Sequence, residues 1–329
     1  MNNKNNVFSG PSALRDFLDP RKNFFTPLVE LPTSLNPFAK DKVRIFAKLM
    51  YLTPLLNIKQ FTAFNMLLDA AESGGLEGIH TLIENSSGNM AFSLAILAPL
   101  FGIENVKAIV PIDIPYIKKE MLNIAGAELI FSKEIPGELS GIALAKKMGE
   151  EKGFLNLGQY EKHTNPKAHE KWTAEQIWTQ TKGKITVFCA GLGTTGTIVG
   201  ARQCFEKKSS KVALVGVMVA PGHAVPGVRS RARLAEIKFD WEKDVNLVEA
   251  EAKESFEKSL KLLRSGVIAG PSSGFAFSGL LKFLESKKRA DELEKLRNKD
   301  GEVVAVFVCG DLPNNYFDKY FTHLNPQDF

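Results

Sequence analysis

The sequence has 329 residues, 44% of them hydrophobic and 24% charged, with a formal net charge of +5. This mixture is typical of a globular protein with room for two domains, and the dispersed charge excludes the basic, aromatic-rich runs of a nucleic-acid binder. Three cysteines without paired spacing exclude a disulfide framework and a zinc site, so we expect no metal and a cytoplasmic location. The polar start and the lack of a long apolar run predict neither a signal peptide nor a membrane partner.

Short β-branched runs alternate with amphipathic stretches from Val43 onward. Runs without strict alternation are typical of strands buried on both faces. We expect strands at 43–49, 79–83, 106–111, 127–131, 184–189, 211–219 and 303–308. We expect helices at 61–73, 91–101, 115–125, 138–152, 167–181, 196–206, 250–265, 273–286 and 288–297. This order predicts an α/β fold with mostly parallel sheets flanked by helices.

In such folds ligands bind beyond the carboxyl ends of the strands, so the turns there are the first places to search. The turn Glu84-Asn85-Ser86-Ser87-Gly88-Asn89-Met90 joins the strand at 79–83 to a helix. Its small hydroxyl residues and glycine at a helix start predict a socket for a carboxylate or a phosphate. The alternative is that Ser86 or Ser87 only caps the helix.

A second turn, Gly191-Leu192-Gly193-Thr194-Thr195-Gly196-Thr197, follows the strand at 184–189. Its glycines allow close backbone approach and its threonines add donors, which favours a phosphate over a plain turn. The turn also contains G-x-G-x-x-G, but a dinucleotide site needs an acidic residue about 20 residues later. No Asp or Glu lies between Glu206 and Glu236, so the dinucleotide interpretation is disfavoured.

A third turn, Gly270-Pro271-Ser272-Ser273-Gly274, precedes the helix expected at 273–286. It is either another anion-binding helix start or a simple loop-to-helix junction. On the sequence alone the two interpretations have equal weight.

Six stretches then occur in an order that resembles one known family. They are Thr26–Val29, Ile45–Pro54 leading to Lys59, Ser86–Met90, Gly158–Tyr160 with Asn165–Pro166, Gly193–Thr197 and Ala269–Gly274. Together they resemble the cysteine synthase / cystathionine β-synthase family of pyridoxal phosphate (PLP) enzymes, of fold type II. The resemblance extends from about Thr26 to Tyr320.

The resemblance implies a role for each stretch. Lys59 would hold PLP as a Schiff base and act as general base, and its apolar neighbourhood suits a neutral amine. Asn89 would contact the ring hydroxyl of PLP. The residues implied to bind the PLP phosphate are Gly193, Thr194, Thr195, Gly196 and Thr197. The residues implied to bind the substrate are Ser86, Ser87, Gly88, Asn89, Met90 and Gln159.

Three positions depart from the family pattern. Gln60-Phe61 replaces Asp-Arg after the cofactor lysine, which predicts altered packing beneath the cofactor. Met90 replaces a threonine of the substrate loop. A serine that would face the pyridine nitrogen is expected after the last strand, where Leu312 stands, so Asp311 and Cys309 are the polar candidates.

The implied architecture has two domains with PLP in the cleft between them. The larger, phosphate-binding domain would comprise 1–58 and 165–329, with residues 1–24 as an N-terminal arm. The smaller, mobile substrate-loop domain would be 59–164. The family also implies a homodimer acting on a small amino-acid substrate.

The implied reaction is β-replacement on O-acetylserine or O-phosphoserine via an aminoacrylate, with a thiol or amine as nucleophile. Arg229, Arg231 and Arg233 stand where the family has a glycine-rich flap, and could bind a phosphate leaving group unless they form a solvated basic loop. The alternatives are a β-eliminating lyase or deaminase that releases pyruvate and ammonia, and a catalytically degenerate binding protein.

Overall fold

The protein is described by a computed structural model that covers residues 6–133, 140–208 and 211–329. The chain folds as two compact units. Unit 1 contains residues 58–168 together with the N-terminal residues up to Phe24. Unit 2 contains residues 25–57 and 169–329.

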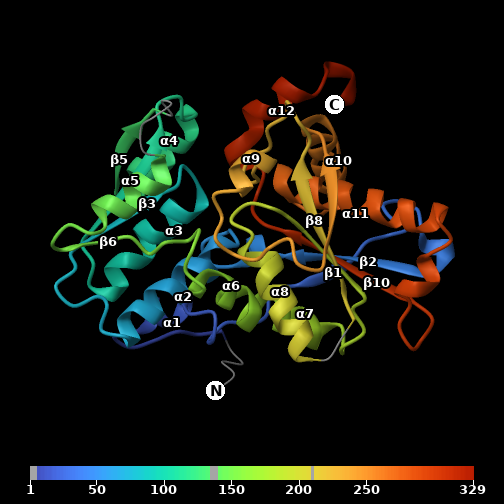
Figure 1. Cartoon of the computed structure of the whole chain (residues 1–329), viewed down its shortest axis with the longest axis horizontal. Coiled ribbons are helices and arrows are strands. Elements are labelled where there is room, and N and C mark those ends of the chain that lie inside the picture. Colours follow the sequence, from blue (N-terminus) through green and yellow to red (C-terminus); the bar gives the residue numbers. More distant parts are fainter. Residues whose placement is uncertain (1–5, 134–139, 209–210) are drawn as a thin grey trace. The chain divides into compact units, whose positions relative to one another are not determined.

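Unit 2 is built on a six-stranded sheet in the order β1-β2-β10-β7-β8-β9 (Figure 1). Only the short β1 runs antiparallel to its neighbour, and the other pairs are parallel. The strands are β1 (Leu28–Glu30), β2 (Val43–Leu49), β7 (Val187–Gly191), β8 (Ala213–Val219), β9 (Val245–Ala250) and β10 (Val303–Cys309). Every residue of β10 is buried, as a central parallel strand covered on both faces requires.

Helices cover both faces of this sheet (Figure 1). On one face, alternate strand residues such as Ala47, Cys189 and Phe307 form a core with Phe277 and Leu280 of α11. On the other face, Phe188 of β7 packs edge-on against Phe205 of α8. The helices of unit 2 are α7 (Glu175–Gln180), α8 (Gly196–Lys207), α9 (Arg231–Leu234), α10 (Ala252–Arg264), α11 (Pro271–Arg289) and α12 (Phe317–His323).

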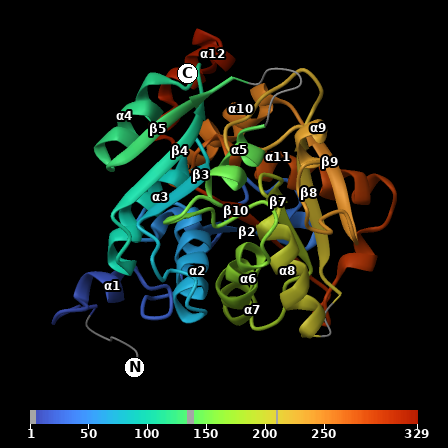
Figure 2. The same cartoon turned by 60° about the vertical axis from the view of Figure 1, so that its left-hand side comes forward.

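Unit 1 contains a fully parallel four-stranded sheet in the order β5-β4-β3-β6 (Figure 2). Ile83 and Ile109 pack against Ala145 of α5 on one face, and α3 and α4 lie on the other. The strands are β3 (Thr81–Asn85), β4 (Asn105–Pro111), β5 (Ala127–Ser132) and β6 (Phe154–Leu155). The helices are α1 (Ala13–Leu18), α2 (Lys59–Glu72), α3 (Asn89–Leu97), α4 (Tyr116–Ile124), α5 (Gly141–Met148) and α6 (Thr164–Ala168).

The N-terminal arm groups with unit 1. The sequence had placed it in the larger domain. Two contacts explain this. The Gln60 side chain, fully buried in α2, donates from Nε2 to the carbonyl of Leu18 at 3.0 Å. The guanidinium of Arg15 lies 4.6 Å from the ring centroid of Phe101.

The expected α/β class with largely parallel sheets is confirmed, and all seven expected strands are present within two or three residues of the observed bounds. The short strands β1 and β6 and the exposed edge strand β9 were not predicted. The helix expected at 288–297 is wrong, because α11 continues to Arg289 and Asp291 then adopts a left-handed backbone (φ 56°). Only a short 3₁₀ turn, Leu293–Leu296, remains there.

Two other expected helices are interrupted. The stretch expected at 167–181 consists of α6, a π-helical turn (His169–Ala174) and α7. The stretch expected at 91–101 becomes α3 followed by a 3₁₀ turn (Ala98–Phe101), where Pro99 cannot supply an N–H to an α-helix. Of the helix expected at 138–152, residues 138 and 139 lie outside the described part. No helix in the described ranges is both long and apolar enough to span a membrane.

Candidate active site

The central strands of unit 2 bring their carboxyl ends to one edge of the sheet. Phe307 of β10 is level with Cys189 of β7, so Cys309 and Gly191 end the two strands at the same height. The turns after these strands are residues 192–197 and 310–316. Because neighbouring strands lie about 5 Å apart, the two turns begin side by side at this edge of the sheet.

The turn at 193–197, here called the phosphate loop, leads into α8. Thr195 is the N-cap of that helix in a left-handed backbone conformation (φ 62°). Its side chain is 3% exposed, and its Oγ1 has no hydrogen-bond partner among the residues that the structure describes. A buried hydroxyl at the open N–H groups of a helix start fits an anionic guest that accepts from both.

The phosphate loop is in close contact with residues on two sides. A Cβ on Gly193 would lie 2.5 Å from the carbonyl oxygen of Gly227, so only glycine fits there. On the α8 side, Thr197 Oγ1 lies 3.4 Å from Nε2 of the buried His169. The other ring nitrogen of His169 lies 3.0 Å from Thr173 Oγ1. Nothing in the local sequence indicated this histidine, because the contact joins two separate helical segments.

The third turn lies beside the end of β10. Gly270 N donates to the Asp311 carbonyl at 2.8 Å, and Gly310 N donates to Ser273 Oγ at 3.2 Å. Asp311 is buried and its Oδ2 accepts from the Tyr316 hydroxyl at 2.6 Å. Ser272 is the half-buried hydroxyl residue of this turn.

The candidates for the pyridine nitrogen therefore differ in position. Cys309 is fully buried in the hydrophobic core, and burial raises the pKa of its thiol far above the usual range. This burial disfavours a ligand contact by Cys309. Leu312 packs against the same core. Asp311 remains at the edge of the sheet. Ser272 is a further hydroxyl candidate, which the sequence had placed in the third turn without considering this role.

In unit 1 the turn at 86–90, here called the carboxylate loop, follows β3. Ser86 Oγ accepts from the N–H groups of Gly88 and Ala91, each at 3.4 Å, so Ser86 does act as a local cap. Met90 is 2% exposed and packs in the interior, so its side chain is not available to a substrate. Ser87, Gly88 and Asn89 are half-buried at the start of α3.

Gln159 lies directly against this loop. Its Nε2 donates to the Asn85 carbonyl at 3.3 Å, and the Tyr160 hydroxyl donates to the same carbonyl at 2.9 Å. Asn165 Nδ2 donates to the Gln159 carbonyl at 2.7 Å. Thus the structure brings Gln159 to Asn85, directly before the carboxylate loop, although the two residues are 74 positions apart in the sequence.

Lys59 is the first residue of α2 and is half-buried. The N-terminal end of a helix is electropositive, which disfavours an ammonium group and suits an amine nucleophile. Gln60, at the family's aspartate position, donates a hydrogen bond to the N-terminal arm, and Phe61 is buried in the core. These contacts account for both departures next to Lys59.

Burial alone would have selected a different lysine. Lys48 in β2 is fully buried, and burial lowers its pKa to about 7. Its Nζ, however, donates to the Thr26 carbonyl at 2.6 Å and to Gln176 and Gln180 Oε1 at 2.8 and 2.9 Å. Lys48 therefore fastens β2 to α7 and is engaged in structure.

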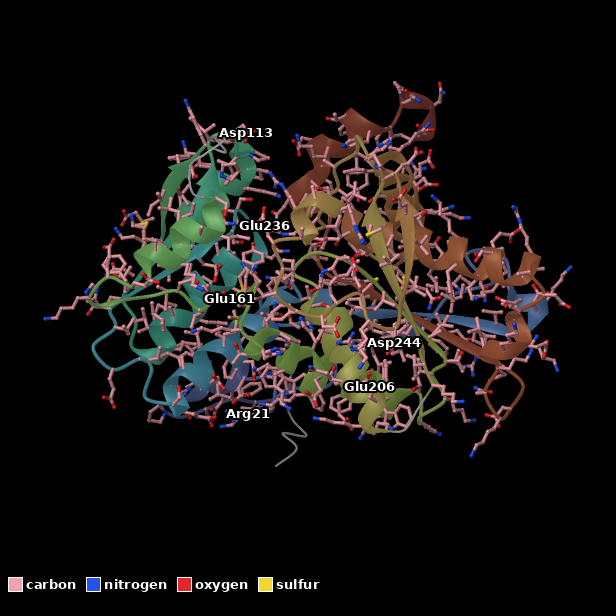
Figure 3. All side chains as sticks on the ribbon, viewed as in Figure 1. Arg21, Asp113, Glu161, Glu206, Glu236 and Asp244 are labelled. Carbon is pink, nitrogen blue, oxygen red and sulfur yellow. The ribbon has the colours of Figure 1, made fainter. Side chains whose placement is uncertain are left out.

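The arginines of the flap have different surroundings. Arg229 N donates to the Leu192 carbonyl at 2.8 Å, next to the phosphate loop, and its guanidinium lies 3.6 Å from Glu236, labelled in Figure 3. The Arg229 side chain is only 16% exposed. Arg231 instead pairs with Glu242 at 2.6 Å and lies over the Trp241 ring. The interpretation as a solvated basic loop therefore suits Arg231 better than Arg229.

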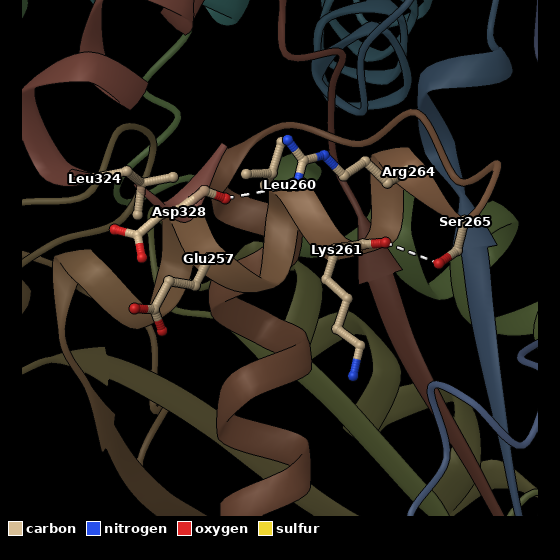
Figure 4. A pocket seen from close by; sticks show the side chains of 7 residues that line it. All are labelled: Glu257, Leu260, Lys261, Arg264, Ser265, Leu324 and Asp328. Atoms are coloured by element: carbon tan, nitrogen blue, oxygen red, sulfur yellow. Dashed lines mark hydrogen bonds between the residues drawn. The ribbon is translucent and has the colours of Figure 1, made fainter. Parts of the chain in front are cut away.

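A separate hollow of about 260 Å³ lies near the C-terminus of unit 2 (Figure 4). It is formed by Glu257, Leu260, Lys261, Arg264, Ser265, Leu324 and Asp328. None of the expected site residues lines it. In the described residues no cluster of three or more His, Cys, Asp or Glu side chains could hold a metal ion.

Comparison with known proteins now decides the family. The family model described as pyridoxal-phosphate dependent enzyme matches residues 21–310. This chain belongs to the pyridoxal-phosphate dependent enzyme family. PLP is therefore its cofactor, as the sequence had indicated.

Relatives and solved structures agree with the family. Cysteine synthase B of Salmonella typhimurium is 31% identical over 86% of this chain and 89% of its own length. Cysteine synthase of Aquifex aeolicus is 29% identical, with 87% and 86% covered. The cysteine synthase structure from Entamoeba histolytica has a TM-score of 0.78 at 20% identity, covering 99% and 94% of the two chains. O-ureido-L-serine synthase has a TM-score of 0.78 at 21% identity, covering 92% and 93%. The last two show that the fold is shared.

The residues present fit PLP. The buried Thr195 hydroxyl and the α8 N-terminus suit its phosphate, and Lys59 stays the predicted source of the amine that its aldehyde requires. The degenerate binding-protein alternative is not supported by the comparisons, which indicate an enzyme.

If Thr195 Oγ1 donates to the phosphate, Thr195→Ala will weaken PLP binding by the apoprotein about tenfold or more, the cost of one hydrogen bond to a charged group. Fluorescence titration of the apoprotein with PLP measures this. Thr195→Ser keeps the hydroxyl and should bind nearly as well as the wild type. Equal affinity of the alanine variant and the wild type would contradict the assignment.

Proposed function

We propose that the chain catalyses PLP-dependent β-replacement on an activated L-serine derivative, in the manner of a cysteine synthase. The observation that carries this is the family membership with about 30% identity to cysteine synthases over most of the chain. Those names favour sulfide or another thiol as the nucleophile over an amine. The α/β fold and the two anion-binding loops agree with the proposal.

Each site residue has a task in this reaction. Gly193, Thr194, Thr195, Gly196 and Thr197 bind the phosphate of PLP, and Asn89 contacts the ring hydroxyl. The pyridine nitrogen faces Asp311, with the hydroxyl of Ser272 as the second candidate and the buried Cys309 as the weakest. Ser86, Ser87, Gly88, Asn89 and Gln159 hold the substrate carboxylate, to which Met90 contributes only its backbone N–H.

Catalysis then depends on where these residues hold the amino acid and its protons. Bound PLP supplies an electron sink for the bond that breaks at Cα. Lys59 would hold the cofactor, and its Nζ would accept the Cα proton as general base. The carboxylate loop and Gln159 fix the substrate so that the Cα–H bond is presented to Nζ. The group on Cβ departs, and the nucleophile takes its place.

The β-eliminating lyase differs from this only in the last step, because water rather than a thiol ends the reaction. Pyruvate release measured with and without sulfide distinguishes the two. A synthase loses most of its pyruvate release when sulfide is added.

We further propose that the protein is a cytoplasmic homodimer in which residues 59–164 move as a body. The resemblance to the family supports the cytoplasmic homodimer. The separate compact unit supports the movement of residues 59–164. Light scattering after size-exclusion chromatography should give about twice the 36.3 kDa chain mass. A single-chain mass at micromolar concentration would contradict the dimer.

Lys59→Ala should remove covalent attachment of PLP and lower β-replacement about a thousandfold, because the general base is lost with it. Borohydride reduction followed by peptide mass spectrometry should place PLP on Lys59 in the wild type and on no residue in the variant. Lys147→Ala, an exposed change on α5, should alter neither result. Attachment to another lysine would overturn the assignment.

Arg229→Ala should lower kcat/KM for O-phosphoserine at least tenfold and leave O-acetylserine nearly unchanged, if its guanidinium pairs with the phosphate leaving group. Steady-state assays with both donors measure the ratio. Arg231→Ala is the control, because its guanidinium is engaged with Glu242 and Trp241. If Arg229→Ala, Arg231→Ala and Arg233→Ala all leave O-phosphoserine turnover unchanged, the arginines play no part in donor choice.

A further inference from the structure

Glu84 is a buried carboxyl group directly before the carboxylate loop. It is 1% exposed and lies near the carboxyl end of β3, on the opposite sheet face from Ile83. Its Oε1 accepts from Asn85 N at 3.1 Å. Its Oε2 has no hydrogen-bond partner among the residues that the structure describes. An ionised carboxylate at such a position needs donors to both oxygens, and here only Oε1 accepts a hydrogen bond from the described residues.

Glu84 adjoins the groups that hold the substrate loop. The Asn85 carbonyl, one residue on, accepts from both Gln159 Nε2 and the Tyr160 hydroxyl. On the other side, Asn156 Nδ2 donates to the Ile83 carbonyl at 2.7 Å. The carboxyl group of Glu84 thus lies within the polar layer that supports Gln159 and the carboxylate loop.

Burial raises the pKa of Glu84 to about 7, and the neighbouring polar groups of Gln159, Asn85 and Asn156 oppose this only in part. Few ionisable groups occur on the described elements packed against β3. In β4, Lys107 is paired with Glu128 at 2.9 Å. On α5, Lys146 is paired with Glu161 and Lys147 is exposed. Helix α3 and strand β6 have no ionisable side chain, and Tyr160 adds a phenol.

We propose that Glu84 is a positioning residue that must be a neutral carboxylic acid for the carboxylate loop to bind an amino acid, and that its deprotonation weakens substrate binding. This rests on the proposed role of the loop. Two physical reasons support it. An ionised Glu84 would repel the substrate carboxylate within a protein interior of low dielectric. It would also draw the Gln159 amide toward itself, away from the substrate.

The sign of the effect follows from the raised pKa. The unfolded chain releases this proton near pH 4.5 and the folded chain near pH 7. The stability that the neutral acid supports is complete below pH 4.5 and is lost as the pH rises through 7. Amino-acid binding should weaken over the same upper range, and bound substrate should raise the pKa of Glu84 further.

Glu84→Gln provides the test, because glutamine keeps the shape of the side chain but cannot ionise. L-alanine, which has no leaving group on Cβ, is titrated into the PLP-loaded protein from pH 6.0 to 8.5 while the cofactor absorbance is followed. The ratio of wild-type Kd to variant Kd should rise about tenfold across this range, since ionisations shared by both proteins cancel. Glu128→Gln, at a side chain that is 62% exposed, should leave the wild-type profile unchanged. A constant ratio for Glu84→Gln would overturn the proposal.

Two further arms separate the possible failures. Ser87→Ala and Gln159→Ala should weaken L-alanine binding at every pH; if they do not, the proposed role of the loop fails. If they do and the Glu84→Gln ratio is constant, only the role of Glu84 fails. Should Glu84→Gln not fold, Glu84→Met supplies a neutral side chain of similar length for the same comparison. In the wild type, the infrared carbonyl band of a buried protonated acid should be present at pH 6.0 and weaken by pH 8.5, and its absence at pH 6.0 would overturn the proposal without any variant.

Discussion

The parallel alignment of β2, β10, β7 and β8 is the constraint on which the chemistry of unit 2 depends. Parallel neighbours deliver all their carboxyl ends to one edge, so residues more than 100 positions apart in the chain meet there. Cys309 and Gly191 end their strands at one height, and the turns that follow supply Asp311 and the phosphate loop. Antiparallel pairing would have sent these two turns to opposite ends of the sheet.

Each unit contains some of the residues for which a binding role is proposed. Unit 2 holds the phosphate loop, Asp311, Ser272 and the arginine flap. Unit 1 holds Lys59, the carboxylate loop and the layer of Glu84 and Gln159 beneath it. Within unit 1 the same rule of parallel strands applies, because β3 ends where the carboxylate loop begins.

The departures from the family pattern have local physical explanations. Gln60 replaces a charged residue with an amide that can donate to the Leu18 carbonyl, and this contact attaches the N-terminal arm to α2. Met90 is buried, so its position serves packing rather than ligand contact. The end of β10 keeps an acidic residue, Asp311, whose carboxylate accepts from Tyr316.

Much was determined by the sequence itself. Periodicity and turn residues specified the α/β class and the seven main strands and predicted two anion-binding loops, because these features depend on neighbours within one segment. Six ordered motifs indicated the family, which the family model confirmed, and they predict Lys59 as its cofactor lysine. Only the tertiary structure decided what burial does to each side chain. The side chains of Cys309 and Met90 are buried in the interior, and the Lys48 amine donates to three oxygens. One carboxyl oxygen of Glu84 has no hydrogen-bond partner among the described residues. His169 contacts the phosphate loop from a separate helical segment, which local patterns do not encode.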